Sequence, residues 1–255
     1  MKAVYGILML VTLAGIICAA GCISNETGKD VTPPPVAEQD KIVLTGEGNN
    51  RDIIPIDLQT EIHISLPENP TTGYSWNVTG SNGLTIKDDT FIPPKEQIPG
   101  AGGMHVWTLE PKVTGIVTFS AVYTRPWEDI QPDEDNTYTV TFYVTPDGTA
   151  VMNVISANNG ATISVSKGDA VLVALDENPT TGYQWTAGVS GTAEIATDSF
   201  IPPHSDTPLV GAGGIHKWLV TFTGAPSGTF DAAYARPWEE TVADDTSFTV
   251  TFAGI

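Results

Sequence analysis

Three short motifs, each present twice and in the same order, carry the residue types in this chain that could do chemistry. NPTTGY occupies residues 69–74 and 178–183, GAGG occupies residues 100–103 and 211–214, and RPWE occupies residues 125–128 and 236–239. Threonine hydroxyls donate and accept hydrogen bonds, and an arginine beside a tryptophan is typical of binding hot spots. These residues favour binding to another surface. Taken alone, each motif could also be only a turn, a hairpin tip or a strand end.

Catalysis has little support in the sequence. The histidines are His63, His105, His204 and His216, and no two of them have the spacing of metal ligands. His105 and His216 stand at equivalent positions two residues before a tryptophan, so we expect a structural role for both on a strand. The repeated part contains no GxSxG motif, no phosphate-binding glycine loop and no cysteine nucleophile. We therefore predict a protein that is not an enzyme and needs no metal and no cofactor.

The charge of the chain argues against nucleic acid as a partner. The formal net charge is −19, and such an acidic surface repels phosphate backbones. Acidic residues gather after each RPW motif: Glu128, Asp129, Asp133, Glu134 and Asp135 in the first copy, and Glu239, Glu240, Asp244 and Asp245 in the second. These stretches are either solvated loops or a means of steering the chain toward a basic partner surface.

The repeat divides the chain of 255 residues into two domains. NPTTGY recurs after 109 positions, and the other two motifs recur after 111. Such a period is too long for a solenoid unit, so each copy is expected to hold its own core. We place the first domain at residues 41–146 and the second at residues 147–255.

Apolar residues alternate with polar ones throughout the repeat, which is the pattern of strands with one buried face. In the first copy we expect strands near residues 41–44, 52–56, 60–66, 74–79, 84–91, 104–110, 115–124 and 138–145. Seven or eight short antiparallel strands indicate an all-β fold, an immunoglobulin-like β-sandwich in each copy. Trp76, Trp107, Phe119 and Tyr123 are the large core residues that we expect.

Counting strands predicts where the three motifs lie. They follow the third, fifth and seventh expected strands of each copy. Because successive strands run in opposite directions, every second connection lies at the same end of a sandwich. We therefore expect the three motifs to gather at one end of each domain.

Residues 1–22 have the features of a secretory signal. Lys2 is followed by an uncharged stretch, and small residues precede Cys22, as in lipoprotein signals that are cut before a lipid-bearing cysteine. The alternative is an uncleaved helical anchor. Cys18 and Cys22 are the two cysteines of the chain, so no disulfide is expected in either domain. Proline-rich residues 23–40 are expected to form a flexible tether that holds the domains on the outer face of the cell membrane.

NPTTGY, then a glycine-rich loop, then RPW, resembles the chagasin family, which inhibits papain-like cysteine proteases. The resemblance covers residues from about 41 to 255, as two complete domains. It implies that three loops of each sandwich enter the protease cleft reversibly, as a wedge. The threonines would meet the catalytic centre, the glycine-rich loop would follow one side of the cleft, and RPW would contact the other side.

Carried over position by position, the resemblance implies the following protease-binding residues. They are Asn69, Pro70, Thr71, Thr72, Gly73, Tyr74, Gly100, Ala101, Gly102, Gly103, Arg125, Pro126 and Trp127, and then Asn178, Pro179, Thr180, Thr181, Gly182, Tyr183, Gly211, Ala212, Gly213, Gly214, Arg236, Pro237 and Trp238. We expect a monomer that binds papain-like proteases. The alternative function is a cell-surface adhesion or ligand-binding module that uses the same loops.

Overall fold

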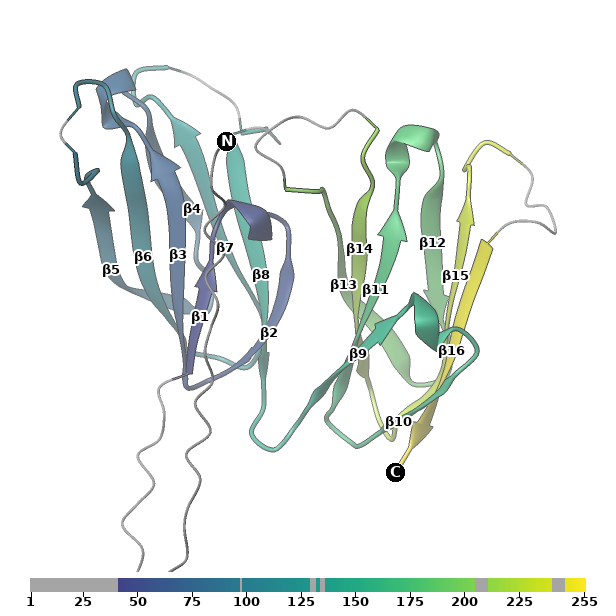
Figure 1. Cartoon of the computed structure of the whole chain (residues 1–255). Coiled ribbons are helices and arrows are strands. Elements are labelled where there is room, and N and C mark those ends of the chain that lie inside the picture. The colour runs from purple at the N-terminus through teal and green to yellow at the C-terminus, as the bar shows by residue number, and fades with distance from the viewer. Residues whose placement is uncertain (1–40, 97, 129–131, 134–135, 205–210, 240–245) are drawn as a thin grey trace, which may run out of the picture. The chain divides into compact units, whose positions relative to one another are not determined.

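The computed structural model describes residues 41–96, 98–128, 132–133, 136–204, 211–239 and 246–255 (Figure 1). The first sandwich consists of β1 (Lys41–Thr45), β2 (Ile53–Asp57), β3 (Thr60–Glu68), β4 (Ser75–Gly80), β5 (Leu84–Ile92), β6 (Gly103–Pro111), β7 (Gly115–Thr124) and β8 (Thr137–Thr145). The second consists of β9 (Val151–Ile155), β10 (Thr162–Val165), β11 (Ala170–Glu177), β12 (Gln184–Val189), β13 (Ala193–Ile201), β14 (Gly214–Phe222), β15 (Ser227–Ala235) and β16 (Thr246–Gly254). The fold is thus all-β, as the alternation predicted. The N-terminal signal, Cys18, Cys22 and the tether lie outside the described residues.

Each sandwich is made of two four-stranded sheets. Their strand orders are β1-β3-β6-β5 and β2-β8-β7-β4 in the first copy, and β13-β14-β11-β9 and β10-β16-β15-β12 in the second. The expectation that all strands are antiparallel is wrong, because β1 pairs with β3, and β2 with β8, in parallel. The reason is that the chain changes sheet at η1 (Glu47–Asn49), so one edge segment supplies a strand to each sheet.

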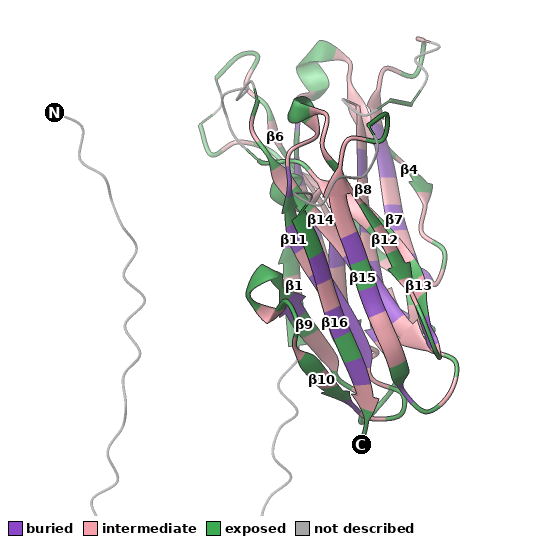
Figure 2. Cartoon of the chain, turned by 90° about the vertical axis from the view of Figure 1, so that its right-hand side faces the viewer, coloured by how far each residue is buried: buried purple, intermediate pink, exposed green. Residues whose placement is uncertain are grey.

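Burial alternates along the central strands. In β8 every second residue, from Tyr138 to Val144, is buried, while Thr139, Thr141 and Tyr143 between them are partly exposed. Figure 2 shows the same alternation along β16. Valines, isoleucines and aromatic residues at these positions favour the pleated conformation and cover one face of each sheet.

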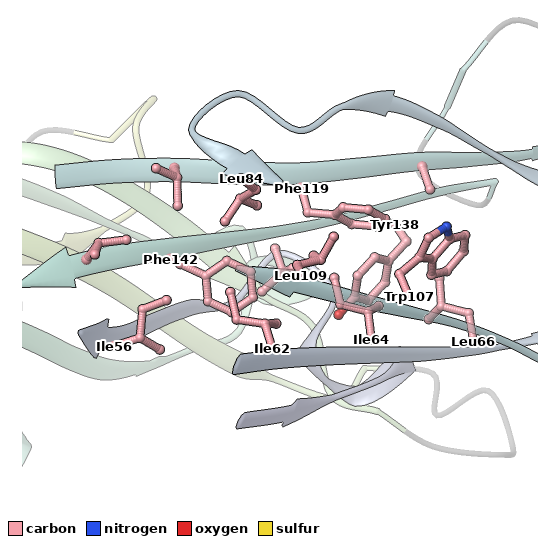
Figure 3. Close-up of a cluster of buried hydrophobic side chains, with 14 residues drawn as sticks. Ile56, Ile62, Ile64, Leu66, Leu84, Trp107, Leu109, Phe119, Tyr138 and Phe142 are labelled. Atoms are coloured by element: carbon pink, nitrogen blue, oxygen red, sulfur yellow. The ribbon is translucent and has the colours of Figure 1, made fainter. Parts of the chain in front are cut away.

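Two of the four large residues that we expected in the core of the first sandwich are fully buried there (Figure 3). Trp107 and Phe119 are fully buried, with ring centroids 5.3 Å apart. Trp76 is partly buried and packs against this core, whereas the assignment of Tyr123 to the core is corrected because it is only partly buried and lies outside the cluster. They lie at the end of the sandwich, where Tyr123 stacks on Tyr74 and the Trp76 indole donates to a backbone carbonyl. Both residues lie next to a loop, where the alternation of apolar residues along a strand no longer predicts full burial.

A second buried cluster joins the two sandwiches. Ile53 from β2 of the first copy packs with Ala170, Leu172 and Leu219 of the second. Lys217 beside them forms an ion pair of 2.5 Å with Asp52. Strand β11 is therefore buried on both faces, which explains why residues 170–175 read AVLVAL where the first copy reads EIHISL.

Among the described residues, no helix is long and apolar enough to cross a membrane.

Candidate functional site

The three repeated motifs lie on the connections β3–β4, β5–β6 and β7–β8, and on their counterparts in the second sandwich. We call residues 69–74, 100–103 and 125–128 the first loop edge, and residues 178–183, 211–214 and 236–239 the second loop edge. Direct hydrogen bonds between the three loops, described below, confirm that strand counting placed them at one end.

The NPTTG segment folds as a single 3₁₀ turn, η2 (Pro70–Thr72). Asn69 caps the turn, since its side-chain oxygen accepts from the Thr71 amide at 3.2 Å and from the Thr71 hydroxyl at 2.7 Å. Pro70 stands at the start of the turn, where its missing amide hydrogen costs nothing. Gly73 ends it with φ of 82°, a left-handed conformation that favours glycine. The sequence of this loop therefore dictates its shape.

Asn69 also ties this turn to its neighbours. Its side-chain amide donates to the carbonyl of Gly100 at 2.9 Å, which fixes the glycine-rich loop beside it. Its backbone amide donates to the Tyr123 hydroxyl at 2.9 Å, which fixes it to β7. Gly102 completes the contact, because a Cβ there would come within 2.9 Å of the Glu68 carbonyl oxygen. Only glycine allows the two backbones to approach so closely.

Arg125 joins the RPW loop to the NPTTG turn. Its Nε donates to the Thr72 carbonyl at 3.0 Å, and its guanidinium lies 4.3 Å from the ring centroid of Tyr74. The Glu128 carboxylate accepts from the same guanidinium at 2.7 Å and raises the pKa of Arg125. Arg125 is thus a charged brace that remains protonated at any relevant pH.

Trp127 packs the edge of its indole against Gly73 and leaves the rest of the ring in solvent. A Cβ on Gly73 would lie 2.7 Å from Cζ2 of Trp127, yet 70% of the tryptophan is exposed. An exposed aromatic ring held in one orientation is suited to contact with a partner.

The second loop edge repeats this geometry. Asn178 donates to the Gly211 carbonyl at 2.9 Å, and Arg236 donates to the Thr181 carbonyl at 3.3 Å. Gly182 has φ of 84° and lies under Trp238, which is also 70% exposed. Both edges therefore have the same local structure although the surrounding strands have diverged.

The hydroxyl groups of the NPTTG turn are engaged within the loop. The hydroxyls of Thr71 and Thr72 donate to Asn69 at 2.7 Å and 2.6 Å, so their hydrogens are already used inside the loop. What the exposed threonines still present to a partner are oxygen lone pairs and methyl groups. No group of three or more His, Cys, Asp or Glu residues in the described part of the chain could hold a metal ion.

The acidic stretches that follow each RPW motif are described only in part. Glu128 and Glu239 pair with Arg125 and Arg236, at 2.7 Å and 3.0 Å, so these two carboxylates brace the edge. Asp133 accepts a hydrogen bond from the Asn136 amide at 3.0 Å. Asp129, Glu134, Asp135, Glu240, Asp244 and Asp245 lie outside the described residues, and the steering role stays a prediction.

Sequence reasoning missed one buried carboxylate at the base of each edge. Glu68 and Glu177 precede the NPTTG motifs, are almost fully buried, and contact His105 and His216 at 2.8 Å and 2.7 Å. A signal was present, because glutamate and histidine are identical in the two copies at these positions. The structural role expected for both histidines agrees with these contacts.

Comparison with known proteins places the repeat in one family. The model of the "Chagasin family peptidase inhibitor I42" matches residues 56–142 and 164–252. Chagasin of Trypanosoma cruzi is 38% identical over 104 residues, which cover 38% of this chain and 92% of chagasin. Amoebiasin-1 of Entamoeba histolytica is 34% identical over 103 residues, covering 39% of this chain and 95% of that protein.

Two solved structures of similar proteins each cover less than half of this chain. The cysteine protease inhibitor EhICP2 from Entamoeba histolytica has a TM-score of 0.39 at 22% identity, covering 43% of this chain and all of that one. PbICP-C, solved in complex with falcipain-2, has a TM-score of 0.29 at 17% identity, covering 42% of this chain and all of that one.

Proposed function

This chain belongs to the chagasin family of cysteine-protease inhibitors, and from that membership we propose that it is a reversible, tight-binding inhibitor of papain-like cysteine proteases. Members of the family are inhibitors and not enzymes. In this proposal each loop edge enters the active-site cleft of one protease. The NPTTG turn then lies nearest the catalytic centre, with the glycine-rich loop and RPW on either side.

The observation that carries the proposal is that the three loops of an edge are held together before any partner arrives. Asn69 binds the carbonyl of Gly100, Arg125 binds the carbonyl of Thr72, and Trp127 packs on Gly73. Ordering flexible loops on binding costs affinity, and a prearranged edge avoids most of that cost.

The shape and chemistry of the edge support blocking in place of cleavage. Residues 100–103 carry one methyl group as their only side chain, so this loop is thin enough for a narrow cleft. The NPTTG turn is closed by its own hydrogen bonds from Thr72 and Gly73 to Asn69 and Pro70, at 3.1 Å and 2.9 Å. A turn in this conformation does not offer the extended backbone that a protease cleaves.

The test is inhibition of a papain-type protease by the full chain and by a variant with an arginine in each turn, Thr72→Arg with Thr181→Arg. We expect the full chain to inhibit at nanomolar concentration and the double variant to lose at least a hundredfold. The matched control is Thr114→Arg, an exposed threonine in the β6–β7 turn at the other end of the first sandwich. Absence of inhibition by the unmodified chain at micromolar concentration would refute the proposal and leave the adhesion alternative.

The N-terminal segment gives the inhibitor a proposed location. We propose that Cys22 is lipidated and that residues 23–40 tether both sandwiches to the outer face of the cell membrane. The intact mass of the chain recovered from the membrane fraction tests this proposal, because lipidation gives a chain that begins at an acylated Cys22. A chain that still begins at Met1, without added acyl mass, would mean that the uncleaved helical anchor is correct.

A further inference from the structure

Three exposed apolar residues form a row across adjacent strands next to the first loop edge. Ile92 on β5 pairs with Met104 on β6, and Met104 pairs in turn with Pro67 on β3. Ile92 is 51% exposed, Met104 is 37% exposed, and Pro67 is exposed as well. We call these three residues the apolar shelf. The shelf adjoins two of the three loops, because Met104 follows the glycine-rich loop directly and Pro67 precedes the NPTTG motif by one residue.

The outward-facing residues of the same three strands become polar with distance from the loops. The next row consists of Thr90, Val106 and Ser65, and the row after it consists of Asp88, Thr108 and His63. An exposed apolar patch beside a binding edge is typical of an interaction surface. On these strands the shelf is therefore a continuation of the first loop edge, and it ends where the polar rows begin.

The sequence builds this part of the sheet with the same run in both copies. FIPP occupies residues 91–94 and recurs at residues 200–203, on the strand that leads to the glycine-rich loop. The ring of Phe91 lies over Gly103, where a Cβ would come within 2.7 Å of Cζ of the ring. Successive residues of a strand point to opposite faces, so Ile92 points outward while Phe91 covers the glycine. The FIPP run thus fixes the direction of the first member of the shelf.

The second sandwich differs from the first at one end of this row. Ile201 pairs with Ile215, which keeps two apolar members, but the third position is Asp176, an exposed aspartate. The backbone is alike in the two copies, because a tryptophan indole donates to the carbonyl of this third residue in both, at 2.9 Å in the first and 2.8 Å in the second. The two loop edges therefore present the same loops beside unlike surfaces.

We propose that the apolar shelf lies against the surface of the bound protease just outside its active-site cleft, and that it makes the first edge select for proteases whose surface there is apolar. The proposal rests on the inhibitory function proposed above. In that function the glycine-rich loop follows one side of the cleft, and the shelf continues the same side along β5 and β6.

The chemistry of the shelf determines which protease surface fits it. Apolar side chains that are removed from water on binding stabilise the complex, and methionine is enriched at protein interfaces. A charged protease surface at this place would lose its hydration without gaining a partner, which weakens binding. The shelf thus selects by attraction to one kind of surface and by the desolvation cost of the other.

The first experiment asks whether the shelf touches the protease. The full chain with Thr181→Arg, which disables the second edge, also receives the photoreactive residue p-benzoylphenylalanine in place of Met104. Irradiation of the complex with a papain-type protease should give a cross-link to the protease surface outside the cleft. The control carries the same photoreactive residue in place of Thr108, two rows further from the loops. A complex that forms without a cross-link from position 104, or with an equal yield from position 108, overturns the proposal.

The second experiment measures inhibition constants of the full chain with Thr181→Arg against the same protease. Met104→Glu and Pro67→Asp should each weaken inhibition about tenfold, and Pro67→Asp introduces the residue that the second sandwich already has on this backbone. Met104→Ile, which is also the residue of the second sandwich, and Thr108→Glu should leave the constant within twofold.

The outcomes separate the shelf from the function on which it rests. If the unmodified chain inhibits and the two shelf variants match their controls, the shelf is overturned and the inhibitory function stands. If the unmodified chain does not inhibit at all, the inhibitory function is refuted and the shelf with it.

Discussion

Gly73 and Trp127 are in direct contact: the glycine backbone supports one edge of an indole ring that is otherwise in solvent, and a Cβ on Gly73 would lie 2.7 Å from Cζ2 of the ring. In the second copy a Cβ on Gly182 would likewise lie 2.9 Å from Cζ2 of Trp238. The orientation of each exposed tryptophan thus depends on a residue 54 or 56 positions earlier that has no side chain.

Replacing Gly73 with alanine should displace Trp127 and weaken protease binding at the first loop edge. The change combines a left-handed φ of 82° with a steric clash, so we expect a loss on the order of tenfold or more in affinity at that edge. The control is Gly100→Ala, which has a φ of 83° but open space around its Cβ. Titration of the full chain with a papain-type protease checks both variants. Equal losses of affinity in the two variants would show that backbone strain weakens binding and that the displacement of Trp127 does not.

Arg125→Lys should weaken binding at the first edge by roughly tenfold, although the charge is kept. Lysine cannot place one donor on the Thr72 carbonyl and another on Glu128 while lying flat over Tyr74. Arg51→Lys, a change of the same chemistry away from the edge, is the control. The inhibition constant measures the effect. An unchanged value for the Arg125 variant would mean that inhibition does not require these guanidinium contacts.

The first sandwich should lose more stability than the second at alkaline pH. Burial raises the pKa of Tyr138 to about 12, against an ordinary value of 10, and the nearby Thr45 hydroxyl offsets only part of this rise. Because the folded pKa is the higher one, the stabilisation is complete below pH 10 and is lost as pH rises toward 12. Over this pH range the free energy of unfolding should fall by about 3 kcal/mol.

The second sandwich supplies its own control for this prediction, since it has Phe248 at the position of Tyr138. Tyr138→Phe should remove the alkaline loss, measured by denaturant unfolding at pH 9 and pH 11.5. A variant that loses as much stability as the unmodified chain between these pH values would contradict the assignment to Tyr138.

The repeat and the alternation of apolar residues were sufficient to predict two sandwiches and the gathering of the three loops, because both follow from local periodicity and strand order. The parallel pairs of β1 and β2 were not predictable, since they depend on a change of sheet at η1 that leaves no periodic signal. The positions of Trp76 and Tyr123 and the partners of Glu68 depend on tertiary contacts between segments far apart in sequence. The contact between the two sandwiches could have been predicted from the sequence, because residues 170–175 of β11 are all apolar.

Leu219→Asp should separate the two sandwiches. The leucine is fully buried in the cluster that Ile53 and Leu172 share, and an unpaired carboxylate there is costly to desolvate. The matched control is Thr108→Asp, the equivalent position in the first sandwich, which lies outside that cluster. Small-angle scattering should show a larger radius of gyration for the Leu219 variant only. An unchanged radius would mean that the cluster does not hold the sandwiches together.

One chain should bind two protease molecules, because both loop edges retain the same bonds and the same exposed tryptophan. The two sites should not be independent: Pro202, Pro203 and His204 of the second sandwich line one cavity with Glu68 and Asn69 at the base of the first edge. A protease at the first edge therefore lies close to these residues of the second sandwich, and we expect it to bind more weakly than a protease at the second edge. Calorimetry should give a stoichiometry of two for the monomeric chain, and of one for Gly73→Ala or Gly182→Ala at concentrations that saturate only the intact edge.

A stoichiometry of one for the unmodified chain would mean that the first protease excludes the second. The variant Leu219→Asp should then restore a stoichiometry of two.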